Sequence, residues 1–137
     1  MKKDISFKDT QDFYVFTNMF VRTKRELLVG RYPLDDLYKQ FGNKENIANI
    51  FKGCFREINK KGKLMDEHNM SSVTLSLSED EIKMCKLFIN NVLEDLKSQK
   101  EEDMSSIPEI LEQTLSGRDL IIEREIEDFQ KLNKIIL

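Results

Sequence analysis

The stretch LDDLYKQFGNKENIANIFKGCFREI, residues 34–58, decides how this chain of 137 residues is expected to fold. Its pattern predicts two amphipathic helices separated by Gly42 and Asn43, a dipeptide typical of a tight, left-handed turn. The first helix is short and follows Pro33, a residue that favours the first turn of a helix. The second helix is predicted from about residue 44 to 59. Its apolar stripe recurs every three or four residues and consists of Ile47, Phe51, Cys54 and Ile58.

The segments before and after this pair of helices differ in the spacing of their apolar residues. Upstream, a helix is predicted over residues 10–29, capped by Asp9 or Thr10 and ended by Gly30. Its apolar face consists of Phe13, Phe16, Phe20 and Leu27. Downstream of Gly62 the period changes from helical to alternating, which favours strands. We therefore expect a β-hairpin with strands at 63–65 and 72–77 joined by an acidic turn at 66–69.

The C-terminal half is predicted to be helical. Ser78 and Glu81 form a capping box, which opens a helix whose apolar stripe contains Ile82, Cys85, Ile89, Val92 and Leu96. The polar run 98–106 is interpreted as a linker. A second capping box at 106–109 opens the next helix, which Ser116 and Gly117 are expected to break or kink. The last segment, 118–137, is predicted as an amphipathic helix.

These patterns together predict a mostly α fold. Residues 1–77 are expected to form a helix-turn-helix module with a short β-hairpin, and residues 78–137 an acidic, helical part for dimerisation or interaction. The net charge of −3 is small, but its distribution is uneven. Residues 1–63 carry 14 Lys and Arg against 8 Asp and Glu, whereas residues 64–137 carry 8 against 17. This asymmetry favours a basic module that meets a polyanion.

The order of these elements resembles the winged helix-turn-helix DNA-binding domains of the MarR-like kind over about residues 10–97. The segments that carry the resemblance are 34–42, 47–58, 60–65 and 73–78. The resemblance implies that the helix at 44–59 lies in the major groove of double-stranded DNA. It implies a small, non-enzymatic DNA-binding protein, a transcription regulator or an adaptor.

The basic residues cluster on and around this helix. Seven basic and two acidic residues lie between positions 39 and 63, and Lys and Arg supply most of the affinity for phosphates. Asn49 and Arg56 can make bidentate contacts to adenine and guanine. Gly53 either permits close backbone approach or accommodates packing. The expected DNA-binding residues are Lys44, Asn49, Lys52, Arg56, Lys60, Lys61 and Lys63. The alternative interpretation is an ordinary core helix with a solvated outer face.

No pattern in the sequence specifies catalysis, a metal or a cofactor. His68 is the single histidine and is expected as an exposed turn residue, and Cys54 and Cys85 are expected in the core. No glycine-rich phosphate loop, nucleophile elbow or paired-histidine metal motif occurs. Neither a secretory signal nor a membrane-spanning stretch is recognised, so we expect a cytoplasmic protein with no membrane partner.

Two hypotheses about partners follow from the helical C-terminal half. A homodimer is expected through the helix after Ser78 and the terminal helices, because they offer more apolar faces than residues 10–77 can cover. The rival to the DNA-binding hypothesis is an all-helical interaction or inhibitor protein. In that case the acidic helices would bind another protein.

Overall fold

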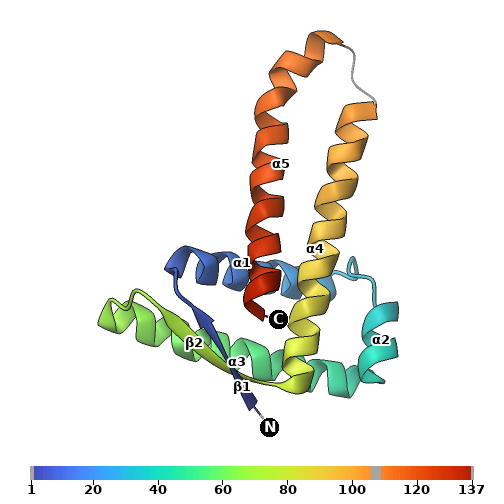
Figure 1. Ribbon diagram of the computed structural model, residues 1–137. Helices are drawn as coiled ribbons and strands as arrows, with labels where there is room; N and C mark the ends of the chain where they lie inside the picture. Colours follow the sequence, from blue (N-terminus) through green and yellow to red (C-terminus); the bar gives the residue numbers. More distant parts are fainter. Residues whose placement is uncertain (1, 106–108, 137) are drawn as a thin grey trace.

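The architecture is a small helical layer with a two-stranded sheet, from which a long helical hairpin projects (Figure 1). The computed structural model describes the backbone of residues 2–105 and 109–136 and the side chains of residues 2–99 and 122–136. The mostly helical fold is confirmed. In chain order the elements are β1 (Lys2–Phe7), α1 (Thr10–Leu28), α2 (Asp35–Phe41), α3 (Lys44–His68), β2 (Val73–Ser78), α4 (Glu79–Ser105) and α5 (Glu109–Ile136).

The sheet joins two segments that lie far apart in the sequence. β1 and β2 pair antiparallel, with Ile5 opposite Leu75 and Phe7 opposite Val73. The apolar residues of both strands face the core, as the alternation in 72–77 predicts. The N-terminal strand was not expected. Its signal is the alternation of polar residues with Ile5 and Phe7, which is short enough to occur by chance.

The expected strand at 63–65 is wrong, because these residues belong to α3. Gly62, expected to end the helix, lies inside it, where an added Cβ would meet the Phe13 ring at 3.6 Å, an ordinary contact. Met65 is buried on the same face as Ile58, seven residues earlier, so tertiary burial continues the helix past Gly62. Asn69 then ends it with a φ of 48°. His68 is exposed in the last turn of α3 and not in a turn between strands.

The starts of three helices are capped by side chains, as the sequence predicts for α1 and α4. Asp9 accepts a hydrogen bond from the Gln11 backbone N–H at 2.9 Å. At the turn between α2 and α3, Gly42 adopts a φ of 91° and the Asn43 side chain accepts from the Asn46 N–H at 2.8 Å. This is the geometry that lets two helices meet at a sharp angle.

The capping box at the start of α4 is confirmed. The Glu81 backbone N–H donates to Ser78 Oγ at 3.2 Å, and the Ser78 N–H donates to Glu81 Oε1 at 2.9 Å. The helix then runs to Ser105, so the expected linker at 98–106 is wrong for its first eight residues. α5 likewise continues through Ser116 and Gly117 without a break. The second capping box, at 106–109, involves residues outside those described.

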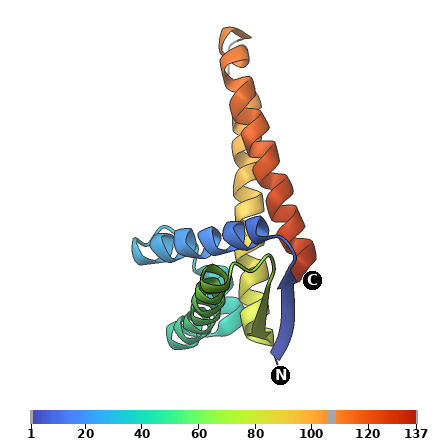
Figure 2. The ribbon, with the colours of Figure 1, turned by 90° about the vertical axis from the view of Figure 1, so that its left-hand side faces the viewer.

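α4 and α5 lie side by side and antiparallel, and they project away from α1, α3 and the sheet (Figures 1 and 2). The first half of α4 and the end of α5 complete the core of the layer. Its buried residues from these two helices are Ile82, Met84, Cys85, Phe88, Ile89, Leu93, Leu132 and Ile136, in one cluster with those of α1, α3 and the sheet. Lys131 Nζ also forms a 2.8 Å ion pair with Asp12 Oδ2, which ties α5 to α1.

We predict that Ile89→Asp unfolds the protein. Ile89 is fully buried on α4, and an aspartate there places an unpaired charge in the core, at a cost of about 4 kcal/mol or more. The matched control is Asn90→Asp, which adds the same charge at the adjacent exposed position and should change the stability by about 0.5 kcal/mol or less. Thermal and urea melts measure both. Equal stability of the two variants would contradict this packing of α4.

Candidate nucleic-acid interface and the groove beside it

Five of the seven expected DNA-binding residues lie along one outward face of α3. They are Asn49, Lys52, Arg56, Lys60 and Lys63, called the α3 stripe below, and all five are exposed. Successive members are three or four residues apart, so they share one side of the helix. The opposite side packs into the core through Ile47, Cys54, Ile58 and Met65. The buried face therefore fixes the direction in which the stripe points.

The α3 stripe has no exposed carboxylate between its ends. Glu57, the acidic residue within this span, has a side chain that is only 15% exposed and forms an ion pair with Lys61 at 3.9 Å. Its Oε1 also accepts a hydrogen bond from the Ser76 backbone N–H at 3.2 Å, which holds the carboxylate against β2. From Asn49 to Lys63 the stripe extends about 21 Å along the helix axis.

The other two expected residues lie elsewhere on the helix. Lys44 is in the first turn of α3, beside α1 and α2. Lys61 is half-buried and turned toward Glu57, away from the stripe. Gly53 faces α4, where an added Cβ would come within 2.5 Å of Glu81 Oε2. Of the two roles considered for Gly53, the structure supports the packing role.

A groove of about 650 Å³ lies between α1, α2 and α3, next to the stripe. We call it the α1–α3 groove. Its apolar lining includes Leu27, Leu34, Tyr38, Ile47, Phe51 and Phe55. Sequence reasoning missed this groove and assigned Phe51 to the core stripe. The available signal is the width of the apolar face of α3, which is greater than one packed helix needs.

The rim of the groove is cationic. Four basic residues, Lys24, Lys44, Lys52 and Arg56, line it, and of the residues that the structure describes no Asp or Glu does. Lys24 Nζ lies 5.1 Å from the centre of the Phe55 ring, a cation–π contact that holds the ammonium at the rim. Lys52 and Arg56 belong both to the rim and to the α3 stripe.

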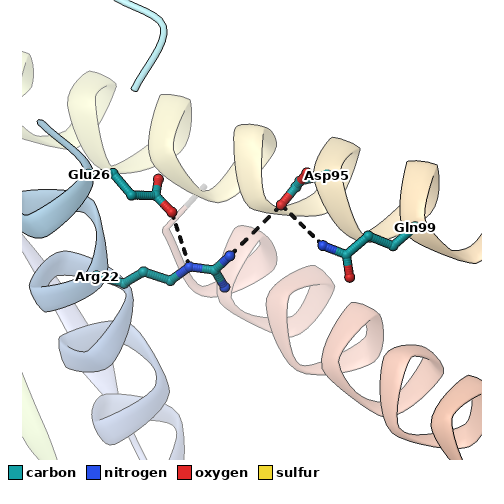
Figure 3. A network of polar contacts seen from close by, with 4 residues as sticks. All are labelled: Arg22, Glu26, Asp95 and Gln99. Carbon is teal, nitrogen blue, oxygen red and sulfur yellow. Dashed lines mark hydrogen bonds and ion pairs between the residues drawn. The ribbon is translucent and has the colours of Figure 1, made fainter. Parts of the chain in front are cut away.

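A second hollow, where α1 faces α4, carries charges of both signs. Arg22 donates to Glu26 on α1 at 3.2 Å and reaches Asp95 on α4 at 3.9 Å, and Gln99 also donates to Asp95 (Figure 3). Arg22 thus pairs with two carboxylates, one on each helix. The Arg22 and Asp95 side chains are about 60% exposed, so the network contributes little to stability.

Cys54 and Cys85 are both fully buried, as the sequence predicts, and burial raises the pKa of the Cys85 thiol. Among residues 2–99 and 122–136, no three His, Cys, Asp or Glu side chains come together to hold a metal ion. None of the described helices is long and apolar enough to cross a membrane.

Comparison of the chain with protein families, curated proteins and solved structures finds no match.

Tyr32 provides a pH-dependent test of the packing between the α1–α2 connection and α4. It is buried, and its hydroxyl accepts a hydrogen bond from the Asn91 side-chain amide. Burial raises the pKa of Tyr32 to about 12, whereas an unfolded tyrosine ionises near pH 10. Between these values the unfolded state loses the proton first. The contribution of the buried Tyr32 hydroxyl to the free energy of unfolding is therefore complete below about pH 10. As the pH rises toward 12, the protein loses about 2 kcal/mol of this stability.

The measurement is the free energy of unfolding from pH 9 to pH 12, compared between the parent protein and Tyr32→Phe. We expect the free energy of unfolding of the parent protein to fall relative to that of Tyr32→Phe across this range, because phenylalanine cannot ionise. Tyr14→Phe, which alters an exposed tyrosine, is the control. Its free energy of unfolding should fall with pH in the same way as that of the parent protein. A constant difference between the parent and Tyr32→Phe would refute the burial of this hydroxyl.

Proposed function

We propose that the protein is a small, non-enzymatic DNA-binding regulator or adaptor that contacts duplex DNA through the α3 stripe. The observation that carries the proposal is the continuous exposure of Lys52, Arg56, Lys60 and Lys63 with no exposed carboxylate among them. Phosphate neutralisation by such a row supplies sequence-independent affinity even on a chain with a net charge of −3. Asn49 and Arg56 are the members able to read base edges.

The pair α2 and α3 supplies the geometry for this function. In helix-turn-helix proteins the second helix enters the major groove, which is about 12 Å wide and admits a single α-helix. Gly42 and the Asn43 cap form the sharp turn that such a pair needs. This pair is the part of the winged-helix resemblance that supports the proposal. The expected wing does not, because β2 pairs with the N-terminal strand and not with residues 63–65.

The α3 stripe gives a direct test in solution. Binding to a random duplex should weaken steeply with salt, and Lys60→Ala and Lys63→Ala should each reduce the slope of log K against log salt by about 0.9, the value for one lost phosphate contact. Lys61→Ala is the matched control on the same helix, and it should leave the slope unchanged because Lys61 faces Glu57. Fluorescence anisotropy at several salt concentrations measures all three variants.

Arg56→Ala separates base reading from phosphate binding. The variant should lose about 1–3 kcal/mol of binding free energy on a duplex selected from a random pool. Its folding should be unchanged, because Arg56 points away from the core. Absence of salt-dependent binding by the parent protein at low ionic strength would refute the proposal. Equal losses for Lys61→Ala and Lys60→Ala would instead place the contact on a different face of α3.

We also propose that the protein acts as a homodimer, paired through the hairpin of α4 and α5. The hairpin projects away from the layer that carries the stripe, so twofold pairing leaves α3 of each copy accessible (Figure 1). Light scattering at micromolar concentration should give twice the chain mass of 16.2 kDa. A mass of one chain would exclude the dimer.

The alternative function is protein binding by the acidic half of the chain. It is favoured by the exposed carboxylates of Glu125 and Glu127 on α5. An acidic surface of this kind has little affinity for DNA, so the same salt titration distinguishes the two functions.

A further inference from the structure

We propose that the α1–α3 groove binds an amphipathic helix from a partner protein, with the apolar face of that helix in the groove and acidic residues along its edges. The groove measures about 650 Å³ and is lined mainly by apolar side chains that no other described element covers. Phe51 and Phe55 are only half-buried in it, although both lie in the middle of α3. Aromatic side chains left in this state gain most when a partner removes them from water.

The apolar surface extends beyond the hollow, which favours a helix over a small molecule. Leu28 is 78% exposed and Leu34 is 38% exposed, and both line the groove where α1 ends and α2 begins. Val29, the next residue after Leu28, is 61% exposed. An extended apolar patch of this kind marks a protein interface. The helix-in-groove mode provides apolar side chains at positions i, i+3, i+4 and i+7 to cover it.

The charges of the rim determine the chemistry of the occupant. Lys24, Lys44, Lys52 and Arg56 surround the apolar surface, and among the described residues no carboxylate lines it. A helix with Asp or Glu beside its apolar face would pair with these cations, which raises the association rate and excludes basic helices. The chain's own acidic helix does not supply this occupant, because Ile122, Leu132 and Ile136 of α5 are buried in the core.

Occupation of the groove has a consequence that rests on the proposed function. Lys52 and Arg56 belong to both the groove rim and the α3 stripe. A bound acidic helix would neutralise both cations, so the partner and DNA would weaken each other's binding by the same factor. The groove proposal itself stands whether or not the protein binds DNA.

The test uses labelled synthetic peptides of about 14 residues, four turns of helix. The probe carries leucine and phenylalanine at i, i+3, i+4 and i+7 and glutamate at the flanking positions. One control peptide has the same composition with the apolar residues scattered around the helix, and a second has lysine in place of glutamate. Fluorescence anisotropy should show the probe binding at least about tenfold more tightly than either control. Equal binding of the three peptides would overturn the proposal.

Variants of the protein separate the groove from the stripe. Leu28→Glu places a carboxylate at the exposed edge of the groove. We expect this variant to bind the probe peptide at least about tenfold more weakly and to bind random duplex DNA as the parent protein does. Val21→Glu is the matched control, an exposed apolar residue of α1 that does not line the groove, and should leave the probe unaffected. Lys60→Ala should weaken the binding of DNA and leave the binding of the probe peptide unchanged. Circular dichroism verifies that each variant is folded.

The remaining occupants have different signatures. Binding of dodecanoate that Leu28→Glu abolishes, without preference among the peptides, would identify a small amphiphile and overturn the proposal. A dimer that Leu28→Glu converts to a monomer would identify a second copy of the chain and overturn it as well. Probe binding that persists while the parent protein binds no DNA would leave the groove proposal standing and refute the proposed function.

Discussion

Burial of Phe88 is the interaction on which the rest of the structure depends. The ring of this α4 residue packs against three other rings. The distance between ring centroids is 5.4 Å to Phe20 on α1, 5.6 Å to Tyr32 in the following connection and 6.0 Å to Phe51 on α3. Such aromatic pairs contribute about 0.5–1.5 kcal/mol each beyond the area that they bury. Because one side chain joins α1, α3 and α4, the projecting hairpin and the helical layer share a single core.

The same packing sets the orientation of the functional surfaces. α3 is held on one side by its contacts with β2 and α4, and Gly53 permits close approach of the Glu81 carboxylate that caps α4. The opposite side of α3 therefore carries the stripe. Beside it, α1 ends at Leu28 and α2 is only seven residues long, so neither helix covers the exposed edges of Phe51 and Phe55.

The stripe and the groove meet at Lys52 and Arg56, and this sharing has a thermodynamic consequence. Two ligands that need the same cations cannot bind independently, and their mutual effect must be reciprocal. One helix that is rigidly packed on its inner face can thus couple two binding surfaces without any change of conformation.

The local patterns of the sequence determined the starts of α1, α3 and α4, the inward face of β2 and the outward position of the stripe. These features depend on residues within a few positions of one another, such as Asp9 with Gln11 or Ser78 with Glu81. Only the tertiary structure decided that α3 continues past Gly62, because Met65 is buried by contacts that lie outside its own segment. It also decided that β2 pairs with Lys2–Phe7, and it opened the groove, since both depend on residues far apart in the chain.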